Sequence, residues 1–233
     1  MFITVERAGS IETIDLVPSK IIGIGVNYRK HAEEMNKGLP EEPLMFLKPR
    51  SALLSDGGAI ERPDGYDRVD FEGELGVVIG TRARRVSVET ALQYVLGFTC
   101  INDVTVRDLQ KKDVQWTRAK GMDTFCPLGP RIVGGLDPRN LRIATRVNGV
   151  MKQDSSTADM IFGVPALIAF CSAHMALEVG DVISTGTPSG VGNLAVGDVV
   201  EIEIENIGTL RNSVIARPPG GSLAPPNGTG SLA

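Results

Sequence analysis

Three acidic residues alternate along one short apolar segment of the 233-residue chain: Asp70, Glu72 and Glu74 in VDFEGELGVVI. Side chains on a β-strand alternate between its two faces, so the three carboxylates would point the same way. Like charges on one face repel, and hard divalent cations such as Mg²⁺ take carboxylate oxygens as ligands. A solvated outer face is the common alternative for an isolated pair of glutamates. Gly73, which permits close approach of another group, and Asp103, which ends an apolar stretch, favour a metal site.

A second candidate pair, His31 and Glu34, lies in the segment NYRKHAEEM. In a helix these two residues share one face, so the carboxylate can orient the imidazole as a general base toward water. A solvent-exposed ion pair is the simpler alternative. The chain has two histidines, and the other one, His174, lies in an apolar segment that is typical of a buried helix.

Two further segments could bind an anion. Lys120 lies in a stretch punctuated by Gly and Pro, and residues 185–192 (TGTPSGVG) offer backbone N–H groups and hydroxyls. Residues 185–192 lack the GK[ST] ending of a phosphate-binding loop, which argues against nucleotide hydrolysis. Gly23 and Gly25 follow an apolar segment, but Tyr28 stands where a dinucleotide-binding fingerprint needs its third glycine.

A fold rich in strands must position these residues. Strands are predicted twice within 1–19, at 20–26, 44–47, 69–79, 95–102, 181–185 and 199–205, and in a hairpin that turns at Asn148-Gly149. Helices are predicted at 27–36, from 86 to 91, at 104–112 and at 165–177, and residues 116–130 are predicted to be irregular. Because strands dominate and the helices are few, the pattern indicates a mixed α/β, β-rich class without a βαβ rhythm.

Composition and charge argue against several classes of protein. The net charge is −4 and Lys and Arg are scattered, so nothing points to nucleic acid. Three cysteines without ligand spacing indicate no disulfide framework, and a reducing compartment such as the cytoplasm fits them. The N-terminus lacks the features of a signal peptide, and the charge-free segment 160–177 predicts a loop and a buried helix rather than a membrane span. Residues 218–233 are rich in Pro, Gly and Ser and predict a disordered tail.

Six segments together resemble the fumarylacetoacetate hydrolase family. They are IGVNYRKHAEEM, PLMFLKP, DFEGELGVVIG, GFTCINDVTVRDLQ, QWTRAKGMDTFCPLGP and ISTGTPSGVG, in family order. The resemblance covers about residues 21–217 and implies one catalytic domain over 1–217, with short N-terminal strands in 1–19. It also implies the family fold, a mixed β-sandwich roll with a few short helices, and a homodimer.

The resemblance implies roles for individual residues. Glu72, Glu74 and Asp103 match the family's metal ligands, which usually hold Mg²⁺ or Mn²⁺. His31 and Glu34 match a pair that activates water and is carried on a short lid helix. These roles assign the metal-binding carboxylates and the general base to separate segments of the chain.

The remaining predicted site residues face the substrate. Lys120 matches a lysine that steadies the carboxylate of the substrate or the developing enolate. The residues that are expected to contact the substrate are Arg107, Gln110, Thr187 and Tyr28. Lys48, in the FLKP segment, matches a family lysine to which the resemblance assigns no role.

The activity that the resemblance implies is hydrolysis of a C–C bond in a small 2,4-diketo acid of the acylpyruvate type. It would depend on Mg²⁺ or Mn²⁺ and proceed through a metal-stabilised enolate and an activated water. The same enolate would serve an oxaloacetate-type decarboxylase or a 2-hydroxymuconate-type isomerase or tautomerase. A module that binds a 2-keto acid without turning it over is the non-enzyme alternative.

Overall fold

The structure is a computed structural model that describes residues 1–34 and 38–219. The tail predicted for 218–233 lies outside the described residues from residue 220 on, as does the end of the helix predicted for 27–36. In the described part of the chain, no helix is long and apolar enough to cross a membrane.

The largest element is a nine-stranded mixed sheet with the order β2-β1-β11-β9-β8-β14-β3-β4, in which β5 also pairs with β11. Its strands are β1 (Phe2–Arg7), β2 (Ser10–Asp15), β3 (Ile21–Gly25), β4 (Leu44–Lys48), β5 (Leu53–Ser55), β8 (Gly73–Ile79), β9 (Val95–Asn102), β11 (Cys126–Val133) and β14 (Val182–Ser184). Antiparallel pairing of β8 with both β9 and β14 places β8 in the interior of this sheet.

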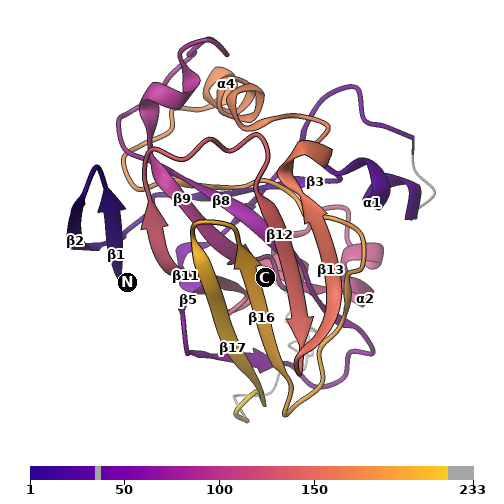
Figure 1. Cartoon of the computed structure of the whole chain (residues 1–233). Helices are drawn as coiled ribbons and strands as arrows, with labels where there is room; N and C mark the ends of the chain where they lie inside the picture. The colour runs from indigo at the N-terminus through magenta and orange to yellow at the C-terminus, as the bar shows by residue number, and fades with distance from the viewer. Residues whose placement is uncertain (35–37, 220–233) are drawn as a thin grey trace, which may run out of the picture.

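A five-stranded sheet forms a second layer, with the order β13-β12-β16-β17-β6. It comprises β6 (Ala59–Arg62), β12 (Arg142–Val147), β13 (Val150–Ser156), β16 (Val199–Ile204) and β17 (Gly208–Ala216). A small third sheet contains β10 (Thr105–Val106), β7 (Val69–Phe71) and β15 (Gly192–Asn193). Figure 1 shows β12, β13, β16 and β17 lying in front of β8, β9 and β11.

Short helices connect the sheets. They are α1 (Arg29–Glu34), α2 (Arg107–Lys112), α3 (Thr117–Lys120) and α4 (Val164–His174), with 3-10 turns at Arg50–Ala52, Ala91–Tyr94 and Thr157–Asp159. The β-rich mixed class predicted from the sequence is therefore confirmed. The segment 160–177 forms a loop and α4, which packs on the core as predicted.

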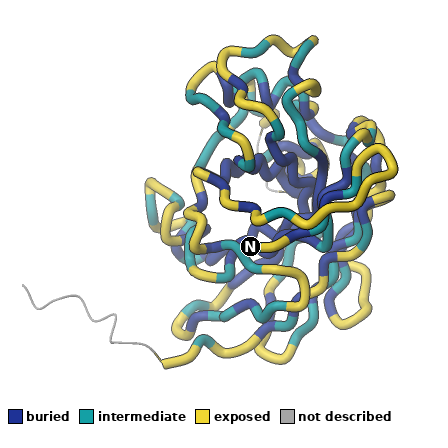
Figure 2. Tube along the Cα trace, turned by 90° about the vertical axis from the view of Figure 1, so that its left-hand side faces the viewer, coloured by how far each residue is buried: buried dark blue, intermediate teal, exposed yellow. Residues whose placement is uncertain are grey.

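The main core lies between the two larger sheets and under α4. Leu75 and Val77 of β8 meet Ile143 of β12, Ile202 of β16 and Leu167 of α4 in one buried cluster. The alternation along β8 turns its even-numbered residues to the opposite face. Buried residues accordingly follow the strands through the interior, while exposed residues lie mainly on the outer turns (Figure 2).

Three local predictions were wrong. The strand predicted for 69–79 is broken at Glu72, so β7 and β8 belong to different sheets. Residues 86–90 are not helical, and only a 3-10 turn follows at Ala91–Tyr94. The stretch 116–130 was predicted to be irregular because of its prolines and glycines, but it holds α3 and the start of β11. Pairing of β11 with β1, β5 and β9 outweighs its unfavourable composition.

The connection from β3 to α1 contains an unusual backbone conformation. Val26 has φ 53°, in the left-handed region that a β-branched residue rarely adopts. Asn27 follows and fixes the turn, because its amide donates to the carbonyls of Phe162 (3.0 Å) and Thr185 (2.8 Å). The contacts of Asn27 therefore hold Val26 in a strained geometry at the start of α1.

Replacing Val26 by Asn should raise the free energy of unfolding by about 1 kcal/mol, since Asn tolerates the left-handed region. Urea titration measures this change. Val191→Asn is the control, because Val191 is also half-buried but has no positive φ. Equal effects of the two substitutions would contradict strain at Val26.

Candidate metal centre and active site

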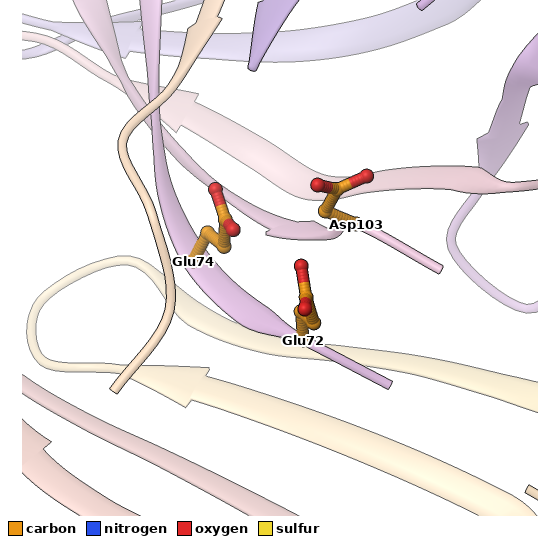
Figure 3. A group of neighbouring side chains, drawn as sticks. All are labelled: Glu72, Glu74 and Asp103. Carbon is orange, nitrogen blue, oxygen red and sulfur yellow. The ribbon is translucent and has the colours of Figure 1, made fainter. Parts of the chain in front are cut away.

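Three buried carboxylates meet at the junction of β7, β8 and β9. Glu72 and Glu74 flank Gly73, and Asp103 directly follows β9, whose Asn102 pairs with Gly73. One oxygen from each carboxylate lies within 4.8 Å of the others, and the three residues are at most 5% exposed. Figure 3 shows the carboxylates turned toward one shared space.

Gly73 lets the two larger sheets approach at this point. A Cβ atom there would lie 2.2 Å from the Thr145 hydroxyl oxygen of β12, so a larger residue would push the sheets apart. Because Gly73 faces the second sheet, Glu72 and Glu74 face away from it, toward Asp103. The close approach that the sequence suggested at Gly73 is thus made by a protein side chain.

Cations from three other elements neutralise two of the acids. Lys120 of α3 donates from Nζ to Glu72 Oε2 (2.7 Å) and to Asp103 Oδ2 (2.5 Å). Lys48 at the end of β4 donates to Asp103 Oδ1 (2.5 Å), and Arg107 of α2 donates to Glu72 Oε1 (2.5 Å). Moving a charged carboxylate from water into the protein interior costs free energy, and these ion pairs offset that cost.

Glu74 has a different environment. Its Oε2 accepts from the Ser184 hydroxyl (2.5 Å) and from the Gly186 N–H (2.8 Å), and within residues 1–34 and 38–219 no Lys or Arg forms an ion pair with it. Burial, followed by the negative charges of Asp103 and Glu72, raises the pKa of Glu74 well above its usual 4.5. Glu74 is therefore the acid of this cluster that most lacks a positive charge.

Glu72 and Lys120 behave in the opposite way. Burial alone would raise the pKa of Glu72, but the charges of Arg107 and Lys120 outweigh burial and lower it far below 4.5. Burial likewise opposes ionisation of Lys120, but Asp103 and Glu72 outweigh it and raise the lysine pKa above its usual value. Glu72 and Lys120 are thus held as an ion pair.

The donor set fits a divalent metal ion. In octahedral Mg²⁺ coordination, ligand oxygens lie about 3 Å apart when adjacent and about 4.2 Å apart when opposite, so these oxygens, which lie within 4.8 Å of one another, would have to draw together by side-chain rotation. Three carboxylate oxygens suit Mg²⁺ or Mn²⁺ rather than softer metals. Glu72, Glu74 and Asp103 could therefore hold such an ion, and their role as ligands stays a prediction.

His31 and Glu34 form a pair at the end of α1. His31 Nδ1 lies 3.1 Å from Glu34 Oε2, and His31 is 4% exposed. The Glu34 carboxylate also receives the N–H of Gly190, at 3.3 Å to Oε2 and 3.4 Å to Oε1. A carboxylate on one ring nitrogen orients the imidazole and leaves the other nitrogen free for acid–base chemistry.

These groups line one cavity of about 500 Å³. The predicted site residues on its wall are His31, Glu34, Glu72, Glu74, Arg107, Gln110, Lys120 and Thr187. The cavity thus brings the predicted base, the lysine, Glu72 and Glu74 together from five separate segments of the chain, while Asp103 lies behind its wall and contacts Lys120.

Two predicted substrate contacts are already engaged within the protein. Arg107 donates to Asp70 (2.8 Å), Glu72 (2.5 Å) and Gln110 (2.8 Å). The Thr187 hydroxyl donates to the carbonyl of Gly73 (2.9 Å). Both side chains line the cavity, and their hydrogen bonds within the protein help to shape the site.

Tyr28 is not among the residues on the wall of the cavity, and its substrate contact stays a prediction. The residue is 1% exposed and packs in the main core, where it forms an antiparallel bridge with Met160. Among the described residues its hydroxyl has no hydrogen-bond partner. Burial, with the charges of Glu74 and Asp159, raises the pKa of the phenol far above its usual value.

Other residues of the site were missed by reasoning from the sequence. Lys48 was given no role, although it is 1% exposed and bonded to Asp103. Asp70 is not in the carboxylate cluster, because Arg107 and Arg68 bind it instead. Its position before the strand break at Glu72 explains the difference, and the alternation in the sequence carries no sign of that break.

A profile described as fumarylacetoacetate (FAA) hydrolase C-terminal matches residues 20–215. The chain therefore belongs to the fumarylacetoacetate hydrolase family and is an enzyme of that family, as the resemblance implied. The match includes every residue of the carboxylate cluster and the strands of both large sheets, except β1, β2 and the last residue of β17.

Similar proteins carry out several reactions. Oxaloacetate tautomerase YisK of Bacillus subtilis is 44% identical over 211 residues, which are 84% of this chain and 70% of YisK. The structure of 5-carboxymethyl-2-hydroxymuconate delta-isomerase from Mycobacterium smegmatis is 45% identical, with a TM-score of 0.83 over 91% of this chain and 85% of that one. Fumarylpyruvate hydrolase from Pseudomonas aeruginosa, in complex with Mn²⁺ and pyruvate, is 26% identical, with a TM-score of 0.84 over 93% and 97%.

Glu74→Gln should stabilise the metal-free protein at pH 7–8, because the neutral amide removes a buried negative charge beside Asp103 and Glu72. The pKa of Glu74 is higher in the folded state than in the unfolded state, so the free energy of unfolding decreases as pH rises above 4.5. A glutamine does not ionise, so the variant should not show this decrease. Urea titration at pH 8 and pH 4 measures the gain, which should vanish at pH 4.

Glu72→Gln is the matched control and should have the opposite sign. The folded-state pKa of Glu72 is lowered, so its carboxylate stabilises the protein above pH 4.5, and its loss leaves Arg107 and Lys120 short of a partner. A loss of roughly 3 kcal/mol is expected. Destabilisation by both substitutions would contradict the proposed difference between the two acids.

Lys48→Met should destabilise the metal-free protein by about 3–5 kcal/mol, because Asp103 would lose a buried cation. Added Mn²⁺ should restore part of that stability if Asp103 is a ligand. Thermal and urea unfolding with and without Mn²⁺ measure both effects. Lys20→Met is the control: its partner Asp181 keeps the N–H groups of Ser19 and Lys20 and should not respond to Mn²⁺.

Proposed function

We propose that the protein is a Mg²⁺- or Mn²⁺-dependent hydrolase that cleaves a C–C bond in a small 2,4-diketo acid of the acylpyruvate type. The observation that supports this most directly is the pairing of buried His31 with exposed Glu34 on the same cavity as Glu72 and Glu74. Only hydrolysis requires activated water among the reactions considered, and this pair is suited to supply it.

The charges of the site suit an anionic keto acid. A divalent cation bound by Glu72, Glu74 and Asp103 would act as a Lewis acid toward the carboxylate and 2-oxygen of the substrate. Such an ion would take over part of the neutralisation that Lys120 gives Glu72 and Asp103. The Lys120 ammonium would then be available to stabilise negative charge that develops on the substrate.

The protein's own base moves the proton. In hydrolysis, the free nitrogen of His31 takes a proton from water, and the hydroxide adds to the distal carbonyl carbon. The C–C bond then breaks, with its electron pair going to the carbon next to the 2-oxo group, which is protonated to give a 2-keto acid. The second product is a carboxylic acid, and Glu34 stabilises the imidazolium between the two proton transfers.

The size of the cavity agrees with this substrate class. Its volume of about 500 Å³ lies within the roughly 300–1,000 Å³ of ordinary small-molecule sites. Half-buried Trp116 and Val191 on its wall provide apolar surface beside the charged groups. An acyl group that extends beyond the 2-keto acid could pack on this surface.

A second candidate is tautomerisation of oxaloacetate or isomerisation of a 2-hydroxymuconate. It is favoured by 44% identity to oxaloacetate tautomerase YisK and 45% identity to the delta-isomerase. In that case His31 would carry a proton between a substrate carbon and the 2-oxygen, and no water would be consumed. An oxaloacetate-type decarboxylase would use the same groups and release CO₂.

The test is an assay with Mn²⁺ of acetylpyruvate, fumarylpyruvate, oxaloacetate and a 2-hydroxymuconate, with analysis of the products. The proposed hydrolase releases a second carboxylic acid, and His31→Ala should lower kcat by roughly a hundredfold or more. His174→Ala is the control, because His174 is exposed and, in the part of the chain that the structure describes, its side chain hydrogen-bonds only to the carbonyl of Phe170.

Other outcomes would contradict the proposal. Release of CO₂ would indicate a decarboxylase, and a spectral change without fragments would indicate a tautomerase or isomerase. Full turnover after exhaustive chelation would exclude a requirement for a metal ion in the reaction. Binding of the acids without any turnover would favour the binding module.

A further inference from the structure

Gln153 of β13 uses its whole amide group within the protein. It is 1% exposed, and its Oε1 accepts from the N–H of Gly73 (3.1 Å). Its Nε2 donates to the Thr187 hydroxyl (2.8 Å) and to the carbonyl of Pro188 (2.8 Å). One side chain therefore connects the backbone of Gly73, which lies between Glu72 and Glu74, to the segment 184–190.

The segment 184–190 contacts an acid of the site at each of its ends. At one end, Ser184 and Gly186 donate to Glu74 Oε2 (2.5 and 2.8 Å). At the other end, the Gly190 N–H lies 3.3 Å from Glu34 Oε2. Glu74 belongs to the carboxylate cluster and Glu34 orients His31, so this segment spans the distance between the two parts of the site.

The segment 184–190 also packs tightly at both ends. Gly190 has φ 95°, and a Cβ atom there would lie 2.1 Å from the carbonyl oxygen of Lys152, the neighbour of Gln153. Gly186 has φ 94°, and a Cβ atom there would lie 2.7 Å from Cβ of Asn27, just before α1. Residues 185–190 lie outside the strands, and besides the backbone hydrogen bond from the Thr185 N–H to the Leu75 carbonyl (3.1 Å), hydrogen bonds with side chains hold them in place.

We propose that Gln153 is a positioning residue that holds the carboxylate cluster and the His31–Glu34 pair at a fixed separation. It acts through Gly73 on Glu72 and Glu74, and through the segment 184–190 on Glu34. This proposal rests on the proposed function, which assigns metal binding to the carboxylate cluster and proton transfer to the His31–Glu34 pair. Its test uses metal binding and histidine resonances, neither of which requires turnover.

The first measurement is the Mn²⁺ dissociation constant of Gln153→Met, by calorimetry without substrate. Met has a similar length but cannot donate to Thr187 or Pro188, so the dissociation constant should rise about tenfold. Asn212→Leu is the matched control. Asn212 is also a buried amide that donates to two carbonyls, those of Ser55 and Gly58, but it lies outside the cavity.

The second measurement follows the side-chain ¹⁵N resonances of histidine in the metal-free proteins at constant pH. The chain has two histidines, so His31 can be compared with His174 in one spectrum. Loosening of the segment 184–190 should change the contact between Gly190 and Glu34, and thereby move the His31 resonances. Those of His174 should stay in place, and Asn212→Leu should move neither.

The proposal is supported if Gln153→Met raises the dissociation constant at least threefold and moves the His31 resonances, while Asn212→Leu does neither. It is overturned if either quantity in Gln153→Met stays at its wild-type value, or if Asn212→Leu changes both equally. If the wild-type protein binds no Mn²⁺, that result contradicts the proposed function instead. The His31 resonances would then be the sole test of the positioning role of Gln153.

A second variant covers a failure of Gln153→Met to fold. Gln153→Glu keeps the length of the side chain and an acceptor for the Gly73 N–H, but it cannot donate to the segment 184–190. Because the new charge alters metal binding directly, the His31 resonances alone judge this variant. Unmoved His31 resonances overturn the proposal.

Discussion

The structure depends on the burial of three carboxylates side by side. Glu72, Glu74 and Asp103 are held within 4.8 Å of one another, where an isolated charge would be too costly to bury. Lys48 and Lys120 offset part of this charge, and they come from β4 and α3. Long-range ion pairing thus requires elements that are distant in the chain to converge on one place.

The convergence also explains the arrangement of the sheets. Gly73 lies against Thr145 of the second sheet, which forces the glutamates on either side of it to face the cavity. The strand break at Glu72 then transfers the chain from the small sheet to the large one. Packing of Leu75 in the core on the other face fixes the register of the whole segment.

Much of this was predictable from the sequence. The β-rich class and the family were predicted correctly, and the acids of the cluster stood out by their spacing and by the resemblance. The roles of Lys48 and Gln153 were not predictable, because each depends on contacts with residues far along the chain. The burial of Tyr28 in the main core was not predictable either, because nearness in sequence to His31 does not determine which face of the turn a side chain takes. The homodimer, the cytoplasmic location and the catalytic roles stay predictions.

Lys120, which bridges Glu72 and Asp103, has a consequence for how the protein would acquire a metal ion. An internal ammonium group, with Lys48 and Arg107 beside it, offsets these acids without an ion, so the polypeptide could fold before any ion binds. An ion would then compete with that tethered cation, which would weaken its binding. We therefore expect an exchangeable cofactor rather than a permanently trapped one, with occupancy that follows the free divalent ion concentration around the enzyme.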